Sequence, residues 1–147
     1  MSVALLDVNV LLALAWPSHV HNRYARTWFK SHRSAQWATC PLTQCAFIRI
    51  SSNPKILAEA CDPADAIALL RRFTSLDNHV FWSDAVPLTA PAVPAELLVG
   101  HRQVVDAYLL GLASHFGGKF VTFDRAVSAL VPTDSPHQQI LEVLLPG

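Results

Sequence analysis

Short apolar runs, separated by stretches with helix signals, constrain this fold more than any other feature of the sequence. Four of these runs are predicted strands, over residues 3–6, 36–39, 80–82 and 120–123. Most are apolar throughout rather than alternating apolar and polar, which is typical of parallel strands covered on both faces. Residues 140–144 predict a further edge strand. The pattern predicts an α/β fold: a three-layer α/β/α sandwich around a central, mainly parallel sheet of four to five strands.

Helix signals lie between the predicted strands. Proline at position 41 suits the start of a helix over residues 41–51, and Asp62-Pro63 suits the start of one over residues 64–75. Further helices are predicted over residues 8–16, 19–33, 103–116 and 125–130. The side chains expected to face the core are Ile67, Leu70 and Phe73 in the helix over 64–75, and Val105, Tyr108, Leu109, Leu112 and Phe116 in the helix over 103–116.

Composition narrows the class of protein. A chain of 147 residues suits a single domain spanning residues 1–147. No apolar run approaches the ~20 residues that span a bilayer, and no basic residue precedes the first apolar run, so we expect a cytoplasmic protein without a membrane partner. The 3 cysteines, Cys40, Cys45 and Cys61, lack metal-ligand spacing and are expected to be small buried hydrophobic residues.

Three aspartates follow strands or begin helices. Asp7 closes the first apolar run, Asp124 closes the run over 120–123, and Asp106 lies in the first turn of the helix over 103–116. Each alone is explained by helix capping or by the helix dipole. Together they map to one side of a parallel sheet, where the carboxyl ends of the strands usually hold the active site.

Clustered carboxylates favour a particular chemistry. They repel one another unless a cation compensates them, and oxygen ligands without His or Cys favour Mg²⁺ or Mn²⁺ over zinc. Such ions act on phosphoryl groups by polarising an oxygen and lowering the pKa of bound water. The 3 aspartates therefore indicate phosphodiester hydrolysis.

The sequence resembles a known family through four segments. These are Leu5-Leu6-Asp7-Val8-Asn9-Val10-Leu11, Thr43-Gln44 within residues 40–54, His101-Arg102-Gln103-Val104-Val105-Asp106-Ala107-Tyr108 and Val121-Thr122-Phe123-Asp124-Arg125. In order and spacing they are similar to PIN-domain ribonucleases of the VapC type, the toxins of bacterial toxin–antitoxin pairs.

The resemblance implies an endoribonuclease that uses Mg²⁺, with Mn²⁺ as a substitute. The implied catalytic and metal-binding residues are Asp7, Asp106 and Asp124, with Asn9 and Thr122 orienting them. It also implies a homodimer and a cognate VapB-like antitoxin whose C-terminal segment lies across the active site.

One position departs from the family pattern. Where the family commonly has a glutamate after Thr or Ser, this chain has Gln44 after Thr43. An amide oxygen can bind a cation but contributes no charge. Three carboxylates would leave a two-Mg²⁺ site at about +1 and a one-Mg²⁺ site at about −1, so a second ion is put in doubt. Glu96 is a possible replacement acid, although its proline-rich surroundings favour a surface position.

Positive charge is local, because the formal net charge is zero. Arg49, Arg102 and Arg125 are candidates to hold RNA phosphates, or else ordinary surface residues. The helix over 19–33 has a basic face that is more simply explained as a solvated surface, formed by Arg23, Arg26, Lys30 and Arg33.

Two other functions compete with the nuclease. A neutral Gln44 is compatible with a decayed site that only binds RNA or an antitoxin. A haloacid-dehalogenase-like phosphatase would also place an aspartate after the first strand, but it needs a second acid two residues later, where this chain has Asn9.

Overall fold

The strands are short and all run in the same direction. In this computed structural model, which describes residues 2–147, they form one sheet with the order β3-β2-β1-β4-β5, and every neighbouring pair among those residues is parallel. The strand bounds are β1 Ala4–Leu6, β2 Trp37–Thr39, β3 His79–Phe81, β4 Lys119–Thr122 and β5 Leu141–Val143. The predicted parallel sheet, with its last strand at an edge, is therefore confirmed.

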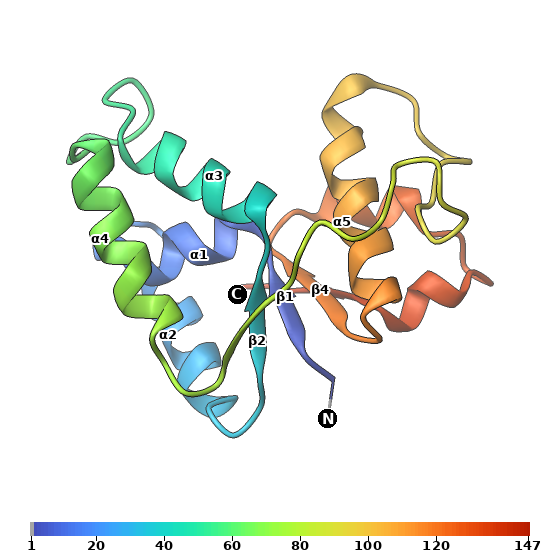
Figure 1. Cartoon of the computed structure of the whole chain (residues 1–147), viewed down its shortest axis with the longest axis horizontal. Helices are drawn as coiled ribbons and strands as arrows, with labels where there is room; N and C mark the ends of the chain where they lie inside the picture. Colours follow the sequence, from blue (N-terminus) through green and yellow to red (C-terminus); the bar gives the residue numbers. More distant parts are fainter. Residues whose placement is uncertain (1) are drawn as a thin grey trace.

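The helices lie on the two faces of this sheet. Their bounds are α1 Val8–Ala15, α2 Asn22–Ser31, α3 Pro41–Ser51, α4 Pro63–Thr74 and α5 Val104–His115, with 3₁₀ turns η1 His101–Gln103, η2 Arg125–Leu130 and η3 Pro136–Gln139. Helices α1 to α4 lie on one side of the strands and α5 on the other (Figure 1). This arrangement confirms the predicted three layers.

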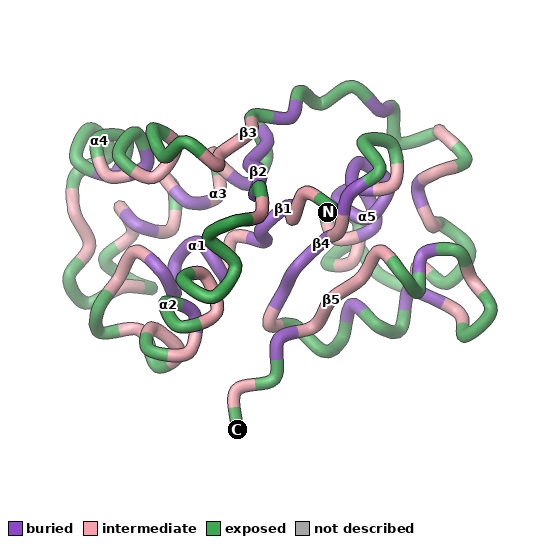
Figure 2. Tube along the Cα trace, turned by 90° about the horizontal axis from the view of Figure 1, so that it is seen from below, coloured by how far each residue is buried: buried purple, intermediate pink, exposed green. Residues whose placement is uncertain are grey.

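Alternate residues of the strands supply two cores. Leu5 and Phe120 point into a core with α5, whereas their neighbours Leu6 and Val121 point into a core with α1 to α4. All 4 side chains are fully buried. Figure 2 shows how the buried residues concentrate along β4 and α5. Continuously apolar strands are required because both faces of the sheet are covered.

Several predicted details are wrong. Ile67, Val105 and Phe116 are 44%, 49% and 38% exposed, because an apolar stripe predicts a helix but not which part of the stripe the neighbouring elements cover. Asp62 occupies the N-cap position of α4, yet its side chain makes no capping hydrogen bond. Among the cysteines Cys40 is buried, Cys61 is intermediate and Cys45 is exposed, so burial fails for Cys45.

The turn after α5 agrees with its sequence. Gly117 has a φ of 68°, the left-handed conformation that glycine adopts without a steric penalty. This turn returns the chain directly into β4 and so fixes the position of the strand that precedes Asp124. Among residues 2–147, no helix is long and apolar enough to cross a membrane.

Candidate active site

Asp7 lies directly after β1 and caps α1. One carboxylate oxygen, Oδ1, accepts the Val8 N–H at 2.7 Å. The other, Oδ2, accepts the Thr122 hydroxyl at 2.7 Å and the Asn9 amide at 3.3 Å. The side chain is only 7% exposed. Asp7 is therefore a helix cap whose second oxygen is held toward the end of β4.

Asn9 and Thr122 join the start of α1 to the segment that carries Asp124. The Asn9 amide donates to Thr122 Oγ1 at 3.1 Å, and its carbonyl accepts the Phe123 N–H at 3.2 Å. Thr122 Oγ1 also accepts the Asp124 N–H at 3.0 Å. Asp124 itself is exposed and caps η2 through the Ala126 N–H at 2.9 Å. The network fixes the backbone on both sides of the strand ends.

Asp106 approaches from the opposite layer of the sandwich. It lies in the first turn of α5 and is half-buried. The start of this segment is anchored by Gln103, whose Oε1 accepts the N–H groups of Val99 and Gly100 at 2.7 and 3.1 Å. Burial, followed by the charges of Asp7 and Asp124, raises the pKa of Asp106 to about 6. The 3 aspartates are therefore close enough to interact electrostatically.

Asp7 responds to the same environment. Burial raises its pKa above the ordinary 3.8, the hydrogen bonds from Thr122 and Val8 lower it, and the charge of Asp124 raises it further. A buried carboxylate with a second carboxylate near it fits a donor set for a hard divalent cation. The group is loose: among residues 2–147, no three His, Cys, Asp or Glu side chains are gathered closely enough to enclose an ion.

The sequence and the structure both match known proteins. The family described as the PIN domain matches residues 4–131. The chain belongs to the PIN-domain family. It is 46% identical to "Ribonuclease VapC39" of Mycobacterium tuberculosis over 96% of this chain and 99% of that protein. It is 48% identical to "Ribonuclease VapC38" of the same species over 87% of this chain and 89% of that protein.

A solved structure supports the same fold. The crystal structure of VapBC2 from Rickettsia felis, bound to a DNA fragment from its promoter, matches with a TM-score of 0.63 at 11% identity. The match covers 96% of this chain and 98% of that chain. Membership of the PIN-domain family removes the haloacid-dehalogenase-like alternative.

In this PIN domain, the side chain of Gln44 at the start of α3 is oriented by the end of β2. Its amide donates to Thr39 Oγ1 at 3.0 Å, and the Thr39 hydroxyl also lies 2.8 Å from His79 Nε2. Burial lowers the pKa of His79, which favours its neutral form. Thr43 is buried and caps α3, because its hydroxyl accepts the Cys40 N–H at 3.0 Å and donates to the Cys40 carbonyl at 3.1 Å.

The remaining predicted residues of this PIN domain lie on the surface. Arg49, Arg102, Arg125 and Glu96 are all exposed. Glu96 lines a different cleft, between the proline-rich connection and residues 130–137. Sequence reasoning missed Thr39 and His79. Thr39 was detectable in principle, because it ends β2 as Thr122 ends β4; His79 begins β3 and carries no such signal.

Proposed function

We propose that this chain is a metal-dependent endoribonuclease, the toxin of a toxin–antitoxin pair. The observation that carries the proposal is the group of 3 interacting aspartates at the carboxyl ends of β1 and β4 and the start of α5, in a PIN domain whose relatives are named ribonucleases. Residues 1–147 would form a single domain, since β5 joins the same sheet as the strands within the family match.

Asp7, Asp106 and Asp124 are the residues that would hold the cation. When bound, Mg²⁺ or Mn²⁺ supplies polarisation of the scissile phosphate and a lower pKa for an attacking water. The Thr122 hydroxyl and the Asn9 amide hold Asp7 in one orientation. Asp106 must lose its proton to bind a cation, and a pKa of about 6 allows this at neutral pH. Exposed Arg49, Arg102 and Arg125 remain proposed phosphate contacts.

Gln44 supports a site that holds one ion more readily than two. Its amide is engaged by Thr39, and the site contains three negative charges rather than four. In Gln44→Glu the added charge should raise Mn²⁺ affinity by about tenfold or add a second ion. Calorimetric titration of both proteins measures this difference. Equal stoichiometry and equal affinity would contradict the one-ion proposal.

RNA cleavage tests the proposed activity directly. The purified protein is incubated with RNA in Mg²⁺, Mn²⁺ or EDTA, beside Asp7→Ala prepared identically. Cleavage that requires the metal and disappears in the variant supports the nuclease. Cleavage that persists unchanged in Asp7→Ala identifies a contaminant and overturns it. Metal-independent RNA binding without cleavage would instead support the alternative, a catalytically weakened module that binds RNA or an antitoxin.

The proposed partners follow from the relatives. The solved neighbour is a VapBC complex, so a VapB-like antitoxin that covers the carboxyl ends of the strands is proposed here, together with a homodimer. Expression of the chain should arrest growth, and an adjacent small gene product should relieve the arrest. Molar mass by light scattering tests the homodimer. Sequencing of RNA ends after induction would identify the substrate.

A further inference from the structure

A groove of about 510 Å³ opens near the start of α2. It lies between the start of α2 and the residues that follow β5, and it is lined by Val20, His21, Arg23, Tyr24, Thr27, Pro146 and Gly147. The chain after β5 is fixed at the end of β4, because the Leu144 N–H donates to the Thr122 carbonyl at 2.8 Å. The groove therefore shares the sheet edge that carries Asp7 and Asp124.

Aromatic rings connect this groove to the acids. His21 stacks on Phe123 with ring centroids 5.0 Å apart and an angle of 26° between the planes. Tyr24 meets the same ring edge-on at 5.9 Å. Phe123 stands between Thr122 and Asp124 in the chain, and Asn9 holds its N–H. One residue thus belongs to both the aromatic group and the backbone of the site.

The exposure of these side chains indicates a surface for a ligand rather than only a core. His21 and Tyr24 remain partly exposed, Arg23 is exposed, and Val20 is 84% exposed. The lining side chains include a cation and aromatic rings but no carboxylate. Aromatic faces beside a positive charge are the combination that binds single-stranded nucleic acid, in which bases stack and phosphates pair with cations.

We propose that this groove binds one nucleotide of single-stranded RNA adjacent to the cleaved bond. Its base stacks on the exposed rings of Tyr24 and His21, and a phosphate lies at Arg23. The inference rests on the proposed ribonuclease function and adds a subsite to it. Because every base has an aromatic face, the subsite requires that a base be present at one position without selecting its identity.

Fluorescence of 2-aminopurine tests the stacking without any cleavage. The probe is placed at successive positions of an RNA oligonucleotide and mixed with Asp7→Asn protein, in which cleavage is expected to be lost. One position should be quenched on binding, and Tyr24→Leu in the same background should remove the quenching and weaken Kd by about tenfold. Tyr24→Phe should restore both. Quenching that is the same in Tyr24→Leu overturns the subsite.

His32 offers a matched control for His21. Both histidines come from the α2 region and stack on an aromatic ring, but His32 stacks on Trp28, at the other edge of the sheet. His21→Ala should weaken RNA binding and His32→Ala should not. An equal loss in both variants overturns the proposal. Because His21 is at the N-cap position, outside the body of α2, its variant also serves if Tyr24→Leu fails to fold.

Cleavage of oligonucleotides with one base removed separates the subsite from the enzyme function. In the parent protein, one abasic position beside the cleaved bond should lower kcat/KM about tenfold, and the same position should have no effect in Tyr24→Leu. Cleavage without a Tyr24-dependent position overturns the subsite and leaves the nuclease intact. Tyr24-dependent quenching without any cleavage supports the subsite and contradicts the proposed function.

Discussion

Charged side chains lie in different environments at the two ends of the strands. The end where the strands finish is the carboxyl edge of the sheet, and the end where they begin is the amino edge. At the carboxyl edge, burial raises the pKa of Asp7 and of Asp106, and the negative charge of Asp124 raises both further. At the amino edge, Glu142 accepts from Trp28 Nε1 at 3.3 Å and pairs with Lys119 at 3.4 Å. Within residues 2–147, Lys119–Glu142 is the one ion pair. The amino edge therefore holds a paired carboxylate, whereas the carboxyl edge holds carboxylates that repel one another.

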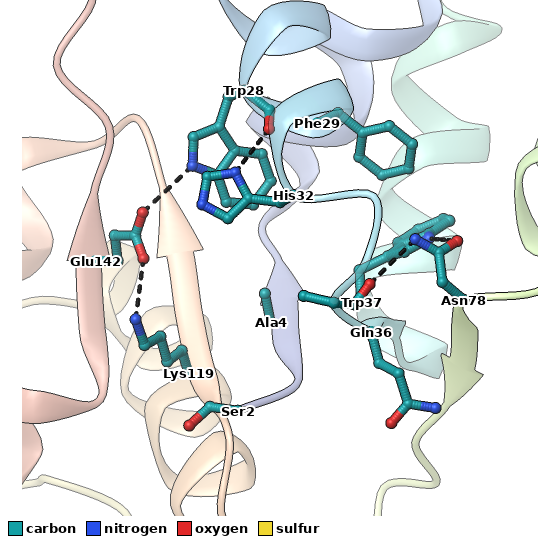
Figure 3. Close-up of a pocket in the computed structure, with 11 residues that line it drawn as sticks. Ser2, Ala4, Trp28, Phe29, His32, Gln36, Trp37, Asn78, Lys119 and Glu142 are labelled. Atoms are coloured by element: carbon teal, nitrogen blue, oxygen red, sulfur yellow. Dashed lines mark hydrogen bonds and ion pairs between the residues drawn. The ribbon is translucent and has the colours of Figure 1, made fainter.

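The packing of side chains also differs between the amino edge and the carboxyl edge. Figure 3 shows the amino edge, where Trp28, His32 and Trp37 surround a cavity of about 70 Å³. Trp28 stacks on His32 at 4.4 Å, and the Trp37 indole donates to Asn78 at 3.1 Å. The buried polar side-chain atoms in the wall of this cavity all have hydrogen-bond partners. Such satisfied polar groups are typical of a region that stabilises the fold. Repelling carboxylates are instead the pattern of a functional site.

The largest effect is expected from removing charge at the carboxyl edge. Asp7→Asn should lower RNA cleavage roughly a thousandfold, because it removes a proposed cation ligand. Its free energy of unfolding should fall by about 1 kcal/mol, because the Asn carbonyl can still accept the Val8 N–H but the amide NH₂ cannot accept from Thr122 and Asn9 as Oδ2 does. Removal of a buried charge offsets part of this loss. Cleavage rates and urea unfolding measure the two quantities.

Glu142→Gln is the matched control for this variant. It removes one carboxylate charge at the amino edge while preserving the shape of the side chain. RNA cleavage should be unchanged, so a comparable loss of activity in both variants would contradict the proposed division of the sheet.

The next effect concerns stability at the amino edge. Trp28→Ala removes the stack on His32, the hydrogen bond to Glu142 and a partly buried indole. The free energy of unfolding should fall by about 2 kcal/mol, less than for a fully buried tryptophan. Activity at a temperature where the variant is folded should equal that of the parent. Denaturant unfolding and cleavage assays test this, and lost activity in a folded variant would count against it.

The sequence predicted the acids better than the aromatic edge. Parallel strands place their carboxyl ends on one side of the sheet, so the sequence predicted that Asp7 and Asp124 lie on that side. The structure adds that β1 and β4 are neighbours. Asn9 and Thr122 lie within two residues of these acids in the chain and were predicted from the resemblance to PIN-domain ribonucleases. Both side chains donate hydrogen bonds to Asp7, as residues that orient this carboxylate would. Their roles in catalysis remain proposals.

Contacts between elements that lie far apart in the chain could not be predicted from the sequence. The Trp28–Glu142 hydrogen bond joins residues 114 positions apart, and no pattern at either residue indicates the other. The Gln44–Thr39–His79 chain depends on a contact between strands that is not a register pair, since His79 pairs with Trp37. Helix periodicity also placed Val105 inside, although it is 49% exposed, because no neighbour covers that side of α5.

A smaller effect links Asp106 to pH. Its pKa is raised from 3.8 to about 6, so between these values the folded protein binds more protons than the unfolded chain. The ion-free protein should therefore lose stability as pH rises through this window, by on the order of 1 kcal/mol after solvent screening. Thermal unfolding in EDTA measures this loss, and Asp106→Asn should reduce it to the part that comes from Asp7, whose pKa is also raised by burial. Activity should change in the opposite direction, with kcat/KM falling below about pH 6 as Asp106 takes up a proton.

The smallest expected effect is that of the ion pair. The side chains of Lys119 and Glu142 are 44% and 33% exposed, so Lys119→Gln should lower the free energy of unfolding by less than about 1 kcal/mol. At about 1 M salt the charges are screened within roughly 3 Å, and the difference from the parent should shrink. At the carboxyl edge, screening weakens repulsion between carboxylates instead of attraction. Salt should therefore stabilise the parent there, and the gain in stability from Asp106→Asn should become smaller. Unfolding both variants at low and high salt compares the edges directly. If salt strengthened the effect of Lys119→Gln, the amino edge would not be held by matched charge.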